Sequence, residues 1–161
     1  MVDTRTADQR RRIMKSVGTK DTGPEWTVRR WLHGRGLRYR LHPKQLPGRP
    51  DIVLPRLRLA IFVHGCFWHC HDCRRGRAPK SNLDYWGPKL ARNRERDIRK
   101  AAELEASGWR VLTVWECETK RDEELSTVLQ PFFEGEAEAR STKPAGCNTG
   151  CGSFDSPEVT E

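Results

Sequence analysis

A run of ten residues, from 64 to 73, most constrains how this chain can fold. It reads His-Gly-Cys-Phe-Trp-His-Cys-His-Asp-Cys and combines three histidines, three cysteines and two large aromatic residues. A structural zinc ion takes four cysteine or histidine ligands, and Cys66, His71 and Cys73 offer three of them at loop spacing. Cys117, which follows an apolar run that is typical of a strand, is the best candidate for the fourth. Such a site would tie a loop that follows one strand to the end of another.

The sequence leaves alternatives to this ligand set. Cys70 could replace His71, because spacing alone does not separate the two. The cysteines could also be buried free thiols beside solvated histidines. Two further cysteines, Cys147 and Cys151, could ligate metal, but we interpret them as an incidental pair.

Length and charge limit the classes of protein. The 161 residues suit one domain with its own core. No apolar run is long enough for a signal peptide or a membrane span, so we expect a cytoplasmic protein whose cysteines bind metal rather than form disulfides. The net charge is +8, and residues 134–161 carry six acids against two bases, which leaves +12 on residues 1–133. This charge predicts a polyanionic partner, although a solvated basic surface explains it too.

Hydrophobic periodicity predicts the order α-β-β-β-α-β-α. The first of these helices begins at a capping box, Thr22-Gly-Pro-Glu25, and carries the apolar residues Val28, Trp31 and Leu32. Residues 1–20 are predicted to form a basic arm or helix, residues 21–134 the folded domain, and residues 135–161 a disordered tail. The predicted elements after the first helix are strands at 37–41, 51–54 and 57–63, a helix at about 88–107, a strand at 109–115, and a last helix with an apolar stripe from Leu125 to Phe132.

The long predicted helix carries a carboxylate on its inward face. Five residues share this face at helical spacing: Leu90, Asn93, Asp97, Ala101 and Leu104. A buried carboxylate is costly unless it is paired, so we expect Asp97 to meet a cation or a histidine of the loop. The alternative is a surface ion pair with Arg94 or Arg96.

A second aspartate lies at the mouth of a predicted strand. Asp51 follows Pro50, and the next predicted strand ends at Val63 and His64. If the two strands are neighbours, a carboxylate, a main-chain carbonyl and an imidazole meet, and these groups could hold a hard divalent ion against a phosphate. The alternative is that Asp51 is an ordinary turn residue.

Four motifs together resemble the very-short-patch repair (Vsr) DNA mismatch endonucleases. They are Pro47-Gly-Arg-Pro-Asp51, Ile61-Phe-Val-His-Gly-Cys-Phe-Trp-His69, Asn93-x-x-x-Asp97 and Gly108-Trp-Arg-Val-Leu-Thr-Val-Trp-Glu-Cys117. The resemblance implies a restriction-endonuclease-like α/β fold of the PD-(D/E)xK type, with an α-β-β-β-α-β core and a structural zinc site. The family lacks the second carboxylate and the lysine of that wider group, and this chain has Val63 and His64 in their places. Family members often have threonine where Val63 stands, and a backbone ligand should tolerate the change.

The resemblance also implies a role for individual residues. Asp51 and the backbone carbonyl of Val63 would bind a catalytic magnesium ion. His69 would be the general base, oriented by Asp97, and His64 would contact the reacting phosphate. Glu25 would join the water shell of the metal, although helix capping explains this residue equally well. The implied zinc ligands are Cys66, His71, Cys73 and Cys117, in agreement with the spacing argument.

Residues that contact DNA are implied as well. Phe67, Trp68 and Trp86 would form a wedge that enters the base stack beside a mismatch, whereas the alternative for any single aromatic residue is core packing. The other predicted DNA-binding residues are Arg10, Arg11, Arg12, Lys89 and Asn93.

The predicted function is therefore that of a magnesium-dependent nickase, which cuts one strand of double-stranded DNA next to a T:G mismatch produced by deamination of 5-methylcytosine. The resemblance implies a monomer in the bacterial cytoplasm, without membrane contact. It would share a pathway with a cytosine-5 methyltransferase and mismatch-repair proteins. Two other functions stay open: a non-catalytic DNA-binding module held together by zinc, and a restriction-type endonuclease that cuts both strands of intact sites. The sequence context of the mismatch is not readable from these residues.

Overall fold

The structure is a computed structural model that describes residues 20–78 and 82–133, together with Thr6, Asp8, Gln9, Arg12 and Gly18. Most of the predicted basic arm, including Arg10 and Arg11, lies outside the described residues, as does the predicted tail with Cys147 and Cys151. The chain divides after Leu129 into two compact units, and the fold reported below belongs to the first of them. The predicted domain limits stay a prediction.

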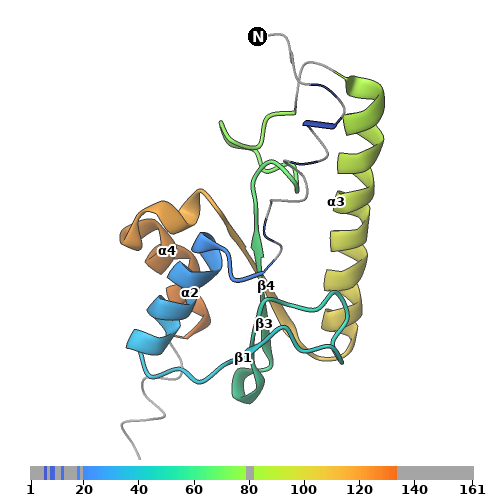
Figure 1. The fold of residues 1–161 in the computed structure, drawn as a ribbon. Coiled ribbons are helices and arrows are strands. Elements are labelled where there is room, and N and C mark those ends of the chain that lie inside the picture. Colours follow the sequence, from blue (N-terminus) through green and yellow to red (C-terminus); the bar gives the residue numbers. More distant parts are fainter. Residues whose placement is uncertain are drawn as a thin grey trace, which may run out of the picture. The chain divides into compact units, whose positions relative to one another are not determined.

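The first unit is built on one four-stranded sheet (Figure 1). Its strands are β1 (Arg40–Leu41), β2 (Ile52–Leu54), β3 (Leu59–His64) and β4 (Arg110–Trp115), and they lie in this order across the sheet. The first three strands pair antiparallel, whereas β3 and β4 are parallel and are connected through the helix α3 (Leu83–Ala106). A parallel pair requires such a crossover. The predicted order of helices and strands is confirmed.

Helices cover both faces of the sheet. In Figure 1, α2 (Gly23–Gly34) and α4 (Asp122–Leu129) lie on one side and α3 lies on the other. The indole N–H of Trp31 in α2 donates to the hydroxyl of Ser126 in α4 at 2.8 Å and joins these two helices. Short 3-10 helices of this unit are η1 (Pro55–Leu57) and η2 (Glu118–Lys120), and η3 (Gln130–Phe132) belongs to the second unit. None of the helices in the described residues is long and apolar enough to cross a membrane.

Strand alternation divides the core into two layers. The register pairs Ile52 with Ile61 on one face of the sheet and Val53 with Ala60 on the other. On the second face, Val53 and Ala60 form a buried cluster with Leu104 of α3, against which Phe62 packs. Alternate residues of a strand share a face. Asp51 lies two positions before Val53, and His64 lies two positions after Phe62. Both therefore face the side of the sheet that carries α3.

Several predicted element limits were wrong. The first strand is only Arg40–Leu41 rather than 37–41, and β3 begins at 59 rather than 57, because the residues before it form η1. Helix α3 begins at Leu83, five residues before the predicted start, so that Pro88 lies inside it. Buried Trp86 anchors the added turn. The last helix ends at Leu129, and Pro131, which has no N–H to donate, falls in η3.

Candidate active site

An open cleft of 1080 Å³ lies between the strand ends and α3. Its sheet wall includes Asp51 and His64, and its helix wall includes Asp97, while His69 comes from the loop after β3. The structure thus brings the two predicted aspartates and the two predicted histidines to one cavity. The sequence reasoning placed Asp51 and His64 at strand ends, Asp97 on the inward face of the helix and His69 in the loop, and these placements are confirmed.

Asp51 is bound to the neighbouring strand. Its Oδ2 accepts a hydrogen bond of 2.8 Å from the backbone N–H of Val63. Burial raises the pKa of Asp51 above its ordinary value, the Val63 N–H lowers it, and the nearby charge of Glu25 raises it again, with a net increase. The net increase means that the positive charge near Asp51 does not offset the cost of burying its carboxylate. The donor set of a carboxylate beside a strand backbone therefore fits a hard divalent cation.

His69 is hydrogen-bonded to Asp97 through Nδ1. The carboxylate accepts, so the proton lies on Nδ1, and Nε2 is left as the basic nitrogen. Burial raises the pKa of Asp97, but the hydrogen bond and the charge of His69 outweigh burial and lower the pKa. Arg96 is a weaker neighbour, with Nε 3.9 Å from Asp97. The predicted histidine partner of Asp97 is confirmed.

His64 stacks on His69. The two ring centroids are 3.8 Å apart and the planes are nearly parallel, at 7°. The pKa of His64 is lowered to about 4. Burial is the largest cause, and the neighbouring His69 lowers the pKa by more than Asp97 raises it. His64 is therefore neutral near pH 7, where it can donate or accept a hydrogen bond but brings no positive charge to the cleft.

Glu25 lines the cleft, but its carboxylate is already engaged. Oε1 accepts hydrogen bonds from the Thr22 N–H at 3.3 Å and the Thr22 hydroxyl at 2.9 Å, and Oε2 lies 2.7 Å from Arg29 Nη2. The residue is only 2% exposed. These contacts agree with the capping explanation, and the role of Glu25 in the water shell of a metal stays a prediction.

A second cluster, the Cys66, His71, Cys73 and Cys117 cluster, lies beside the cleft. Its four ligand atoms lie within 4.8 Å of one another, and His71 Nδ1 is 3.4 Å from Cys117 Sγ. Zinc bonds of about 2.0 Å to nitrogen and 2.3 Å to sulfur in a tetrahedron place these two atoms about 3.5 Å apart. The donor set and its spacing fit zinc. Cys70 is exposed, with φ at 54°, and does not belong to the cluster.

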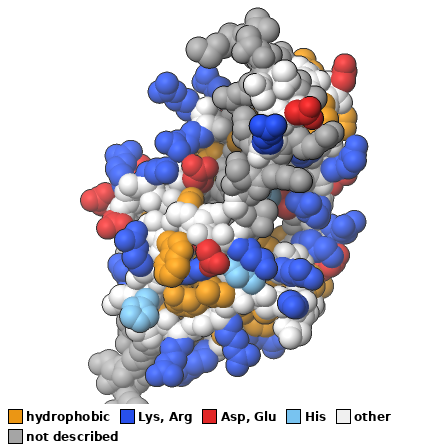
Figure 2. Space-filling view, in the orientation of Figure 1, with side chains coloured by type: hydrophobic (Ala, Val, Ile, Leu, Met, Phe, Trp, Pro, Cys, Tyr) orange, Lys and Arg blue, Asp and Glu red, His pale blue; other side chains and the backbone are white. Residues whose placement is uncertain are grey.

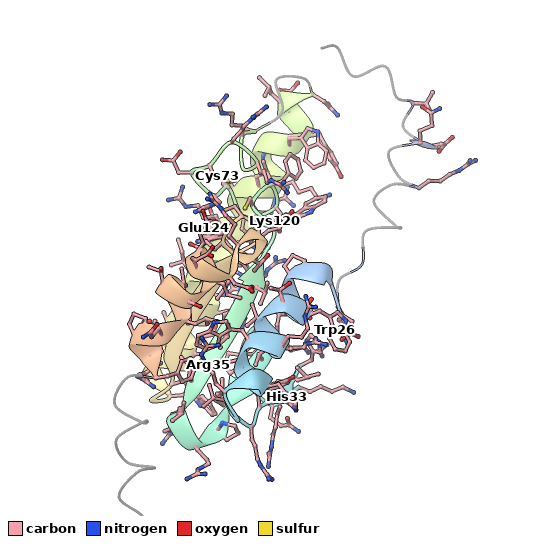
Figure 3. All side chains as sticks on the ribbon, turned by 90° about the vertical axis from the view of Figure 1, so that its left-hand side faces the viewer. Trp26, His33, Arg35, Cys73, Lys120 and Glu124 are labelled. Atoms are coloured by element: carbon pink, nitrogen blue, oxygen red, sulfur yellow. The ribbon has the colours of Figure 1, made fainter. Side chains whose placement is uncertain are left out.

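The loop backbone brings these ligands together. The N–H of His71 donates to the carbonyl of Cys66 at 3.0 Å, and the N–H of Gly76 donates to that of Cys73 at 3.0 Å. A Cβ at Gly76 would lie 1.9 Å from the His71 carbonyl oxygen, so only glycine fits there. Burial would raise the pKa of Cys73, but hydrogen bonds from His71 and from backbone N–H groups lower it to about 7, which favours the thiolate that zinc requires. Figure 3 labels Cys73 in this loop.

The three predicted wedge residues form one aromatic cluster. Phe67 meets Trp68 and Trp86 edge-on, with ring centroids 5.1 and 5.3 Å apart, and Lys89 Nζ lies 5.6 Å from the Trp68 ring. Trp86 is only 8% exposed, whereas Phe67 and Trp68 are partly exposed. The amide of Asn93 donates to the Trp68 carbonyl at 3.1 Å and thereby holds the loop against α3. DNA contact by these residues stays a prediction.

Sequence reasoning missed His42 and Arg29. His42 lies between two acids of the cleft, with Nε2 3.5 Å from Glu25 and Nδ1 3.7 Å from Asp51. Arg29 is buried and pairs with both Glu25 and Asp21. The position of Arg29, four residues after Glu25 on the same helix, was a readable signal. The position of His42 depends on the pairing of β1 with β2.

Comparison with known proteins identifies relatives of the chain. The family model described as DNA mismatch endonuclease Vsr matches residues 2–75. The type II nicking enzyme V.XorIIP of Xanthomonas oryzae pv. oryzae is 58% identical over 135 residues, which cover 81% of this chain and 99% of that protein. The DNA mismatch endonuclease Vsr of Escherichia coli is 40% identical over 141 residues, which cover 84% of this chain and 90% of that protein.

A solved structure is also similar. The catalytic domain of the homing endonuclease I-Bth0305I superposes with a TM-score of 0.49 at 24% identity and covers 71% of this chain and 97% of that domain.

Proposed function

The chain belongs to the Vsr family of DNA mismatch endonucleases, and we propose that it nicks one strand of duplex DNA next to a T:G mismatch, with magnesium as its cofactor. One observation carries this proposal. The carboxylate of Asp51 and the His69 and Asp97 pair face one cleft, so a candidate cation ligand and an oriented imidazole line the same cavity. In hydrolysis of a phosphodiester, a cation can stabilise the charge on the phosphate and an imidazole can take the proton of the attacking water.

Asp51 and the carbonyl of Val63 would hold the magnesium ion. The ion supplies positive charge that stabilises the charge developing on the phosphate oxygens. The raised pKa of Asp51, caused mainly by burial, supports this assignment, because a cation would relieve the same cost.

Proton transfer would depend on the other wall of the cleft. His69 Nε2 takes the proton from the attacking water, while Asp97 holds the Nδ1 proton and stabilises the imidazolium that forms. Neutral His64, stacked on His69, would donate a hydrogen bond to the reacting phosphate. The Cys66, His71, Cys73 and Cys117 cluster would hold zinc and fix the loop that carries His69.

Recognition of the mismatch would combine charge and stacking. Lys and Arg side chains outnumber acidic ones on the face shown in Figure 2, and the 1–133 region carries a net charge of +12. This charge would bind any duplex through its phosphates. Phe67 and Trp68, which are partly exposed beside Lys89, would enter the base stack, and a mismatched step costs less to unstack.

We place the protein in the bacterial cytoplasm, in a pathway that repairs deaminated 5-methylcytosine. Two relatives support a single cut, since they are named as nicking enzymes and are 58% and 46% identical to this chain. One basic domain with one aromatic cluster suits one nick by a monomer. A cytosine-5 methyltransferase and mismatch-repair proteins would act in the same pathway.

The test compares labelled duplexes that differ only in one base. With magnesium, we expect one nick in the T:G duplex and none in the matched T:A duplex. Cutting of both strands in the paired duplex would instead support a restriction-type enzyme. Binding without any nick would support a DNA-binding module held together by zinc.

The recognition step has a separate test in magnesium-free buffer. We expect Trp68→Ala to lower affinity for the T:G duplex toward that of the paired duplex and to leave the salt dependence nearly unchanged. Replacing Arg10, Arg11 and Arg12 with alanine should weaken binding of both duplexes and reduce the salt slope by about one unit per lost phosphate contact. Full mismatch preference in Trp68→Ala would contradict the wedge.

A further inference from the structure

The buried guanidinium of Arg29 lies among three side chains that could otherwise hold a metal ion. The ligand atoms of Asp21, Glu25 and His42 lie within 4.8 Å of one another. Arg29 lies among them, with Nη1 2.6 Å from Asp21 and Nη2 2.7 Å from Glu25 and 3.2 Å from His42 Nε2. Because Arg29 is only 2% exposed and always charged, the protein itself supplies the cation of this trio.

Arg29 lies against one ring nitrogen of His42. A guanidinium has only donors, so in this 3.2 Å contact Nε2 of His42 accepts and the ring proton of a neutral imidazole lies on Nδ1. The other neighbour of Nε2, Glu25 Oε2 at 3.5 Å, is farther away and already accepts from Arg29. Nδ1 is 3.7 Å from Asp51 Oδ1. The other oxygen of Asp51 is held by the Val63 N–H. The Val63 N–H thus bonds one oxygen of this carboxylate, and the His42 ring lies near the other at a distance longer than a hydrogen bond.

The backbone of His42 is adapted to this position. Its N–H donates to the carbonyl of Asp51 at 3.3 Å and continues the pairing of β1 with β2 by one residue. Its φ of 44° lies in the left-handed region, which is unfavourable for a residue with a side chain. Strained backbone persists where the surrounding structure holds it, often beside a functional group.

We infer that His42 is a positioning residue for Asp51: Arg29 fixes its tautomer, and the Nδ1–H group then orients the carboxylate that would bind the divalent cation. The inference deepens the proposed function and rests on its assignment of Asp51 to the metal. Arg29 makes no hydrogen bond to Asp51 among the bonds between described residues, and its charge, like that of His42, lowers the pKa of Asp51 without offsetting burial.

The first experiment reads the tautomer directly by ¹⁵N NMR of the histidine rings in the full chain. We expect the Nδ1–H form for His42 in the wild type and a shift toward the Nε2–H form in Arg29→Met. The matched control is Arg30→Met, one residue along the same helix and exposed, which should leave the spectrum unchanged. An Nε2–H form in the wild type would overturn the inference, as would an unchanged tautomer in Arg29→Met.

The second experiment measures Ca²⁺ binding by calorimetry, because Ca²⁺ takes oxygen ligands as Mg²⁺ does and the readout needs no DNA. We expect His42→Leu to weaken Ca²⁺ binding at least about tenfold, as for loss of a group that orients a metal ligand. His42→Gln should stay close to the wild type, since its amide can accept from Arg29 and donate to Asp51. The control is His33→Leu, near the end of α2 (Figure 3).

Each outcome bears on one claim. Unchanged Ca²⁺ affinity in folded His42→Leu, or a loss in His42→Gln equal to that in His42→Leu, would overturn the inference. If His42→Leu does not fold, His42→Asn replaces it, because its amide is too short to reach both partners, and the same loss is expected. Ca²⁺ binding that survives Asp51→Asn would count against the metal assignment of the proposed function, while the tautomer still decides whether Arg29 sets the His42 ring.

Discussion

Two aspartates face the same cleft, and their surroundings shift their pKa values in opposite directions. Asp51, on the sheet wall, has a raised pKa, chiefly because burial disfavours its charge. Asp97, on the helix wall, has a lowered pKa, because the hydrogen bond and charge of His69 outweigh burial. The partner on the helix wall thus outweighs the cost of burying the carboxylate, whereas the neighbours on the sheet wall do not.

This difference separates two chemical tasks. A carboxylate that already has an imidazole partner can orient a base, whereas one that lacks positive charge is prepared for a cation from solution. With zinc bound, the Cys66, His71, Cys73 and Cys117 cluster would hold the loop that brings His69 to the helix wall. The sheet wall depends instead on the pairing of β2 with β3. A substitution that disrupts one wall of the cleft should therefore leave the other wall intact.

Among the predicted effects, loss of zinc from the loop at the helix wall should be the largest. Cys117→Ser should remove bound zinc and lower the free energy of unfolding by several kcal/mol, because a structural site contributes folding free energy directly. Mass spectrometry gives the zinc content and thermal unfolding gives the stability. Cys70→Ser, in the same loop but outside the cluster, is the control and should keep its zinc. Full zinc occupancy in Cys117→Ser would remove that residue from the site.

Loss of the sheet-wall carboxylate should abolish most activity. Asp51→Asn should reduce nicking of the T:G duplex by at least about a hundredfold and abolish Ca²⁺ binding, since the metal loses a charged ligand. His69→Ala should lose at least about a hundredfold in rate, yet keep Ca²⁺ binding. Asp72→Asn, an exposed residue lining the cleft, is the control. Lost Ca²⁺ binding in His69→Ala would show that the walls are not independent.

Loss of the helix-wall carboxylate should have a smaller effect. Asp97→Asn keeps an oxygen that can accept from His69 Nδ1, so we expect nicking to fall by about tenfold, through weaker stabilisation of the imidazolium. Single-turnover nicking rates measure this effect, and duplex binding in magnesium-free buffer should be unchanged. A fall as large as that of His69→Ala would mean that Asp97 does more than orient the imidazole.

The smallest predicted effect is on the free energy of unfolding. It should rise when Asp51 is replaced and fall when Asp97 is replaced. The raised pKa of Asp51 means that stability falls as pH rises above 3.8, so Asp51→Asn should gain about 0.5–1 kcal/mol at pH 7. The lowered pKa of Asp97 contributes stability above 3.8 that is lost as pH falls through the lowered value. Asp97→Asn should therefore lose about 1 kcal/mol at pH 7. Denaturant unfolding at pH 7 and pH 3 measures both, and equal signs would contradict the comparison.

Local patterns in the sequence were sufficient for much of the fold. The capping box at Thr22 marked the start of α2, and short apolar runs marked β2, β3 and β4. Element limits were harder: the helix predicted from about residue 88 begins at Leu83, and buried Trp86 lies in the added turn. The first strand is short, since Leu37 is buried outside it. Such limits depend on packing between elements rather than on the periodicity of one segment.

The sequence by itself determined the candidate residues of the site: residue type and spacing indicated the cysteine and histidine cluster and the inward Asp97, and the resemblance to the Vsr family implied roles for Asp51 and His69. Only the tertiary structure decided that His71, and not Cys70, belongs to the cluster. It also brought Arg29 against His42, 13 residues away, and His42 near Asp51, a neighbourhood that no motif contains. The reason is physical: spacing reports which residues share a loop or a helix face, whereas charge balance and tautomers depend on which distant segments pack together.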